Sequence, residues 1–513
     1  MPNCKEKRIE VGDPGSPFVQ IGKDILFYVP ARVIPVITSL LSIAAYTRLL
    51  DPKEYGWLSL TMATVSFVNS FAFGWLGYVI WRYFEKYKKE QNLQKFLSTV
   101  GTVSAILFLI VTPLWYLVTL FFSPYLDAYF VYLLRLGILV LGAQVGANLI
   151  LTVLQVQGQS LKYSLYTAIH TLGTLSLAVS LIYFLSWGVE AILLSSVIFM
   201  GGIVGLELHQ FYKRWRISPF YFSSSLFRKF SSFGLPQIGI SVGALILSIF
   251  DRYMIEVLRS TEEVGIYSAG YTIADMCIQI PLSIMMLASL PIIVQTYENR
   301  GEEETRVLFK SLFSLYLIIL VPAVFGIVAL SQNIVEVLLG QSFGSASAIL
   351  PWVAGGSFFF GFSQYSNTPF QLKEKPNQLL YLIIMAAILN IVLNFLLIPP
   401  LGILGAAYAT FLAYLIYLIV SYLLVNRIFP LFFPWKTLSK AILASVGMYL
   451  ILSLGLINLT SKIQSLMINI TMGSLSYFVI LLILREETIW RILFHLNQSL
   501  KSSLSSRGHT QCL

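Results

Sequence analysis

The stretch YLIIMAAILNIVLNFLLIPPLGILGAAYATFLAYLIYLIV (381–420) decides the fold class, because it holds no charged residue over 40 positions. Pro399, Pro400 and Gly402 divide it into two apolar segments. Each segment approaches or reaches the roughly 20 residues that a helix needs to cross a hydrocarbon core. Two membrane spans are therefore predicted here.

The rest of the chain repeats this pattern, with 57% hydrophobic and only 11% charged residues. Fourteen apolar stretches of this kind occur, at residues 25–47, 57–81, 96–122, 131–154, 163–185, 188–209, 234–256, 264–294, 311–330, 346–370, 377–398, 403–425, 439–458 and 467–484. The sequence predicts an all-α polytopic membrane protein of about 14 transmembrane helices.

Lys and Arg residues are distributed unevenly between the two sides of these stretches. Of the 34, 27 fall in alternate segments that begin with the N-terminus. The opposite loops hold Arg48, Lys53, Arg259 and Lys462, and Arg32, Arg135 and Arg252 lie within apolar stretches. The positive-inside rule then places both termini in the cytoplasm, so we expect a multi-pass protein of the cytoplasmic (inner) membrane.

The same inventory argues against several functions. Basic inner loops that face anionic lipid account for the net charge of +10, so no nucleic-acid partner is expected. The sequence has no GxxxxGK[ST] phosphate loop, and its loops are too short for a catalytic domain. Its scattered histidines and its three cysteines form no metal-ligand pattern. We expect neither an enzyme nor a cofactor or metal site.

Three short echoes indicate an internal duplication. Glu54-Tyr55-Gly56 aligns with Glu263-Val264-Gly265, Gln155 with Gln371 and Gly188 with Gly402, at offsets of about 209–216 residues. Two six-helix lobes in the same orientation would place a substrate site between them. The predicted organisation is an N-terminal segment, a first lobe, a linker, a second lobe, an extra helix pair and a tail, at residues 1–24, 25–212, 213–233, 234–425, 439–484 and 485–513.

Two of these regions resemble a known family. TRLLDPKEYGWLSL (47–60) and FDRYMIEVLRSTEEVGIYSAGYTIAD (250–275) are similar to the polysaccharide-export (Wzx-type) flippases, with LGILGAAYAT (401–410) a further match. Lipid II flippases and multidrug and toxin extruders share their superfamily. The resemblance covers about 18–425. It implies a two-lobed, V-shaped bundle that flips an undecaprenyl-diphosphate-linked oligosaccharide by alternating access, alongside polysaccharide assembly proteins.

Charges within the apolar stretches are candidate functional groups, because a charge deep in a bilayer normally faces a cavity or a partner. Arg32 lies between Pro30 and Pro35, and we expect its guanidinium to bind the substrate diphosphate. Asp275 lies near the predicted midplane and is the candidate for binding a coupling H⁺ or Na⁺ or for pairing with an arginine. A structural hydrogen bond is the alternative.

Three further charges lie close to the predicted outer boundary. Arg135, Asp251 and Arg252 are candidate outer-gate charges. Snorkelling to the surface or local pairing is the alternative for all three.

Amide side chains form two matched stripes. Gln144 and Asn148 share one helix face, and Gln364 and Asn367 share another. Hydrogen bonds to sugar hydroxyls and hydrogen bonds between helices are equally compatible with this pattern.

Two other functions remain open. A cation-coupled drug or small-molecule antiporter would have the same fold, although it would favour several acidic residues in its cavity. A membrane glycosyltransferase or polymerase is disfavoured by the short loops.

Overall fold

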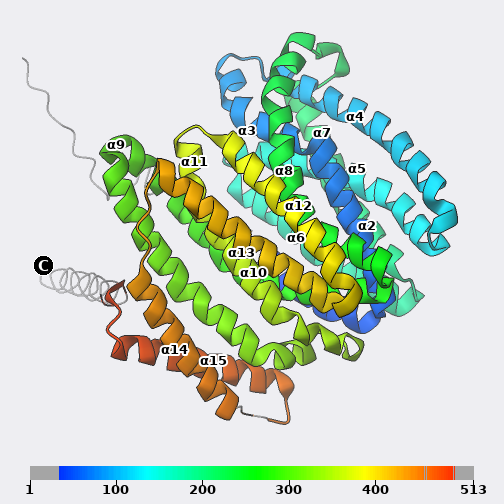
Figure 1. Cartoon of the computed structure of the whole chain (residues 1–513). Coiled ribbons are helices and arrows are strands. Elements are labelled where there is room, and N and C mark those ends of the chain that lie inside the picture. The colour runs from blue at the N-terminus through cyan, green and yellow to red at the C-terminus, as the bar shows by residue number, and fades with distance from the viewer. Residues whose placement is uncertain (1–33, 456, 458, 489, 491–513) are drawn as a thin grey trace, which may run out of the picture. The chain divides into compact units, whose positions relative to one another are not determined.

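The computed structural model describes residues 34–455, 457, 459–488 and 490, and this part of the chain is helical without a strand (Figure 1). All 14 predicted stretches fall on helices, the first of them in its described part, Ile34–Leu49. Among the described residues, 11 helices are long and apolar enough to span a membrane, or 12 with the bent pair Gln341–Ala348 and Leu350–Leu372. Arg32 lies outside the described residues.

The chain forms two compact units, Met1–Ile249 and Phe250–Leu513. Besides Ile34–Leu49, the first unit contains α2 (Pro52–Val68), η1 (Asn69–Phe73), α3 (Gly74–Lys89), α4 (Leu93–Phe122), η2 (Ser123–Tyr125), α5 (Ala128–Val156), α6 (Ser160–Leu185), α7 (Val189–Trp215), η3 (Pro219–Tyr221) and most of α8 (Ser224–Leu258). The element η1 is a short π-helix that joins α2 to α3 without a loop.

The second unit begins in the last turns of α8. It contains α9 (Thr261–Leu338), η4 (Gln341–Ala348), α10 (Leu350–Ser366), α11 (Thr368–Leu372), α12 (Pro376–Leu401), α13 (Ile403–Ile428), α14 (Trp435–Leu454) and α15 (Lys462–Ile483). α10 packs against α9 and α13, and α12 packs against α13 (Figure 1).

Two of the three sequence echoes coincide with matching helix starts. Asp51 caps α2 in a capping box with Glu54, and the Ser260 hydroxyl accepts a hydrogen bond from the Glu263 N–H at the start of α9. These are the same device, in which a small polar residue caps a helix whose third residue is glutamate. Gly188 and Gly402 both immediately precede a helix, α7 and α13.

A single glycine interrupts the long helix α9. Gly301 has φ 82° and ψ −171°, a conformation in the region that essentially only glycine adopts. The break separates the predicted spans 264–294 and 311–330. Next to it, Glu302 accepts hydrogen bonds from Arg306 and from Lys373 in the α11–α12 connection, both at 2.6 Å. The bond to Glu302 raises the pKa of Lys373.

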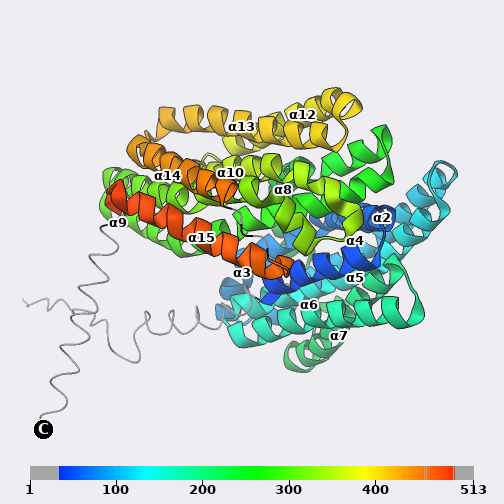
Figure 2. The same cartoon turned by 90° about the horizontal axis from the view of Figure 1, so that it is seen from below.

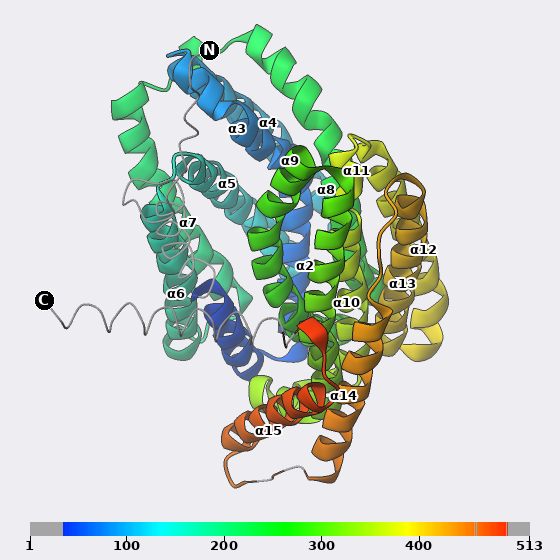
Figure 3. The same cartoon turned by 90° about the vertical axis from the view of Figure 1, so that its left-hand side faces the viewer.

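The last two helices pack on the second half of α9 (Figures 2 and 3). Met448 and Leu452 of α14 and Leu481 of α15 join Ile318 in one buried cluster. Pro322 has no N–H to donate to the Ile318 carbonyl one turn earlier. The Tyr477 hydroxyl donates to this carbonyl instead, at 2.8 Å. α15 therefore satisfies a backbone group that the proline leaves open.

Candidate functional site: a buried polar chain in the second unit

Asp251 and Arg252, at the end of α8, are buried rather than exposed at a surface. Their exposed fractions are 1% and 8%. An Arg252 Nη1 atom lies 3.7 Å from an Asp251 carboxylate oxygen, and its Nε donates to the Ser268 hydroxyl at 3.2 Å. The Arg252 guanidinium also lies over the Tyr271 ring, 4.9 Å from its centroid. α9 thus supplies the surroundings of this ion pair.

The other side of Asp251 is held by Tyr267, whose hydroxyl donates to the carboxylate. Tyr267 is fully buried and also lies within hydrogen-bonding reach of Thr410 on α13. Burying a carboxylate is costly unless it is paired and hydrogen-bonded. Asp251 meets this requirement through Arg252 on its own helix and Tyr267 on α9.

Two asparagines of α12 extend the chain of polar groups. The Asn390 amide nitrogen lies 3.5 Å from the Thr410 hydroxyl, and the Asn394 amide donates to the Asn390 side-chain oxygen at 3.0 Å. Both asparagines are fully buried. The Asn394 oxygen has no hydrogen-bond partner within the described part of the chain, and a buried acceptor of this kind calls for an explanation.

Asp275 lies further along α9, about two helical turns after Ser268 and therefore on the same face of that helix. The Ser357 hydroxyl of α10 donates to its carboxylate at 2.6 Å. Arg252 is close enough to act on Asp275 electrostatically. The structure therefore brings three predicted charges, Asp251, Arg252 and Asp275, into one unit.

The polar side chains of this series carry several oxygen atoms. Carboxylate, amide and hydroxyl oxygens, such as those of Asp251, Asn394 and Thr410, are the kind of hard ligand that alkali and alkaline-earth cations prefer. The described residues contain no group of three or more His, Cys, Asp or Glu side chains that could hold a metal ion. The oxygen atoms of the polar side chains fit a proton or a small hard cation.

Asn390 and Asn394 were missed as candidates from the sequence. They lie four residues apart in the otherwise apolar stretch 377–398, so they share a helix face. This spacing was the available signal, and it is the same signal that singled out the two amide stripes.

The two amide stripes differ in their surroundings. Gln144 is half-buried, and its side-chain oxygen has no partner among the described residues, whereas Asn148 is exposed. Gln364 is half-buried, and Asn367 is buried and donates to the Tyr417 hydroxyl of α13 at 2.8 Å. Asn367 therefore makes the interhelical hydrogen bond of the alternative interpretation. The sugar-binding role of the stripes stays a prediction.

Arg135 belongs to the first unit, unlike Asp251 and Arg252. Its guanidinium lies over the Tyr116 ring of α4, 5.2 Å from the centroid. Glu207, near the end of α7, is fully buried. It accepts a hydrogen bond from Tyr166 and pairs with Lys162, in the first turn of α6, at 2.6 Å.

Two family models and one curated relative match the sequence of this chain. The model of the family "Polysaccharide biosynthesis protein" matches residues 21–297, more than half of the chain. The MatE family model matches residues 236–396. The chain is 24% identical over 263 residues to the "Probable low-salt glycan biosynthesis flippase Agl15" of Haloferax volcanii. That match covers 50% of this chain and 55% of the relative, so the chain spans about half the length of this curated relative.

Solved structures share the fold over a longer range. The inward closed conformation of the lipid II flippase MurJ matches with a TM-score of 0.73 and 16% identity, over 92% of this chain and 100% of that one. An inward-facing multidrug resistance MATE family transporter of the MOP superfamily matches with a TM-score of 0.66 and 16% identity, over 79% and 98%. From its sequence match and this shared fold, the chain belongs to the polysaccharide biosynthesis protein family.

Proposed function

We propose that this chain is a flippase that moves an undecaprenyl-diphosphate-linked oligosaccharide from the inner to the outer leaflet of the cytoplasmic membrane, by alternating access of two six-helix lobes. The observation that carries the proposal is the polysaccharide biosynthesis match over residues 21–297. The name of the Haloferax relative and the fold shared with MurJ support it. In this proposal the protein neither forms nor breaks a covalent bond of its substrate.

The buried polar chain is the candidate for coupling transport to an ion gradient. Asp251, Asn390, Asn394 and Thr410 come from three different helices, α8, α12 and α13. A cation or proton bound among their oxygens would favour one packing of these helices over another. A ligand shifts such an equilibrium only by its differential affinity for the two states. If the three helices separate in one state, the ligand binds more tightly to the other state, and this difference in affinity drives the shift.

Asp275 is the second carboxylate in the proposed ion coupling. Its hydrogen bond to Ser357 joins α9 to α10, and Arg252 is its electrostatic neighbour. Protonation or cation binding at Asp275 or Asp251 would change the attraction of both carboxylates for Arg252. The coupling ion is H⁺ or Na⁺ in this scheme.

Substrate contacts are assigned to residues outside this chain of polar groups. Arg32 is proposed to hold the diphosphate, because a guanidinium binds two phosphate oxygens at once and stays ionised. The half-buried amides Gln144 and Gln364 are proposed to bind sugar hydroxyls.

A cation-coupled multidrug antiporter is the second candidate, and the MatE match over residues 236–396 favours it. One experiment separates the two. Deleting the gene is expected to make a lipid-linked oligosaccharide accumulate on the inner leaflet, with drug sensitivity unchanged. Normal delivery of the glycan lipid together with increased drug sensitivity would support the antiporter.

The proposed orientation has its own test. Cysteines introduced in the loops 123–130 and 331–345 should react with an impermeant thiol reagent from outside, and cysteines at positions 88 and 373 should not. The opposite labelling pattern would reverse the orientation.

A further inference from the structure

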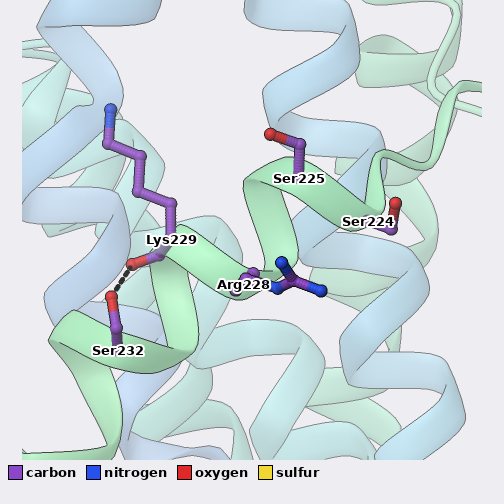
Figure 4. A pocket seen from close by; sticks show the side chains of 5 residues that line it. All are labelled: Ser224, Ser225, Arg228, Lys229 and Ser232. Atoms are coloured by element: carbon purple, nitrogen blue, oxygen red, sulfur yellow. Dashed lines mark hydrogen bonds between the residues drawn. The ribbon is translucent and has the colours of Figure 1, made fainter.

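The first turns of α8 form a polar cavity of about 570 Å³ in the first unit. It is lined by three serines and two cations, Ser224, Ser225, Arg228, Lys229 and Ser232 (Figure 4). All five residues are exposed, and none is acidic. Such a lining offers hydrogen-bond donors and positive charge, which are the groups that bind an anion.

The two cations play different parts. The Lys229 ammonium lies over the rings of Tyr83 and Tyr87, 5.2 and 5.7 Å from their centroids, and 3.5 Å from the Tyr87 hydroxyl. In Figure 4 it points away from Arg228. Lys229 thus holds the start of α8 against α3.

Arg228 is the cation that remains for a ligand. Its guanidinium lies on the same side of the helix as Ser224 and Ser225 (Figure 4). Within the described part of the chain, no carboxylate forms an ion pair with it. A guanidinium matches a phosphate with two parallel hydrogen bonds.

Exposed aromatic residues lie next to the cavity residues in the sequence. Phe220 is 96% exposed, and Tyr221, Phe222 and Phe227 are also exposed. The apolar stretch 234–256 of α8 follows directly. Aromatic side chains concentrate where a membrane protein meets the lipid headgroups. This order of residues is typical of a segment at the depth of lipid phosphates, and we expect the cavity there.

We propose that this cavity binds the phosphodiester of an anionic phospholipid, with Arg228 and the hydroxyls of Ser224 and Ser225 on the phosphate and the neighbouring aromatic side chains among the acyl chains. The site goes beyond the proposed function, because its lipid is resident and is not transported. One phosphodiester charge matches one available guanidinium. A diphosphate carries more charge than this cavity neutralises, and a free phosphate would make no use of the aromatic side chains.

Native mass spectrometry of the purified full-length protein, titrated with phosphatidylglycerol, tests the proposal. The Arg228→Ala variant is expected to lose about tenfold in affinity, as the loss of one charge-assisted interaction implies. Lys213→Ala is the matched control, because it removes an exposed cation from the end of α7 outside the cavity. It should change the affinity less than twofold. Ser225→Asp adds a negative charge to the cavity and should abolish the same binding.

Any one of three results would overturn the proposal. The first is equal binding of phosphatidylglycerol by Arg228→Ala and Lys213→Ala. The second is displacement of the lipid by inorganic pyrophosphate at equal concentration. The third is displacement by a polyprenyl diphosphate, which would make the cavity a substrate site. If Arg228→Ala lowers the melting temperature, the Ser225→Asp result decides on its own.

Discussion

Replacing Gly405 with alanine should separate α12 from α13. A Cβ at this position would lie 2.1 Å from the Leu397 carbonyl oxygen and 2.4 Å from its carbon. These are backbone atoms of the facing helix, so no side chain can rotate away. Restoring an ordinary contact of 3.4 Å requires a shift of about 1.3 Å.

This shift carries an energetic and a functional cost. Overpacking of this kind destabilises by about 1–3 kcal/mol. The contact between Asn390 and Thr410, already 3.5 Å long, would be lost as well, which adds about 1 kcal/mol. We therefore expect Gly405→Ala to be destabilised by about 2–4 kcal/mol and to couple transport poorly to the ion gradient.

Thermal unfolding in detergent, followed by fluorescence-detected size-exclusion chromatography, measures the effect. Gly326→Ala is the matched control. Gly326 lies in α9 of the same unit, and a Cβ there would meet only the terminal methyl of Met448, at 4.0 Å. It should melt at or slightly above the wild-type temperature, since alanine favours a helix over glycine. A wild-type melting temperature for Gly405→Ala would refute the steric reasoning.

Three further predictions follow from the charged residues. Asp275→Asn keeps the shape and hydrogen-bonding capacity but cannot titrate, so it should bind substrate in proteoliposomes and fail to transport against a gradient; wild-type flipping with unchanged pH and Na⁺ dependence would make Asp275 structural. Arg32→Ala should lose most transport while Arg32→Lys keeps part, and normal export by a stably expressed Arg32→Ala variant would exclude the diphosphate role. Lys162→Met leaves the buried Glu207 carboxylate without its cation and should cost about 3 kcal/mol of stability, measured by thermal unfolding; adding Glu207→Gln should recover much of this loss, and a double variant as unstable as Lys162→Met would contradict it.

The helices were predictable because the bilayer dictates their length and apolar character. Each predicted stretch falls on a helix in the described residues. The echo of Glu54 in Glu263 was also informative, since both glutamates follow the cap of a helix at the same distance. In these cases local chemistry alone sets the structure.

The site was less predictable because it depends on contacts between distant helices. Gln144 and Asn148 share a helix face by spacing, yet only Gln144 is half-buried. Asn390 joins the polar chain through Thr410, 20 positions away on the next helix. Spacing identifies a common face, but it does not say which neighbour that face meets.

The π-helix η1 has a genetic consequence. Its i→i+5 hydrogen bonds hold one residue more in the turn than the i→i+4 bonds of an α-helix. Deleting one residue from 69–73 would let α2 and α3 join as a regular α-helix, with every backbone bond still made. Because the π-turn absorbs its extra residue locally, α3 would keep nearly the same rotation about its axis, and Trp75, Leu76 and Val79 would stay buried. The same deletion within α3 would instead turn every residue after it by about 100°. A single-codon deletion should therefore be tolerated in η1 and rejected a few codons later.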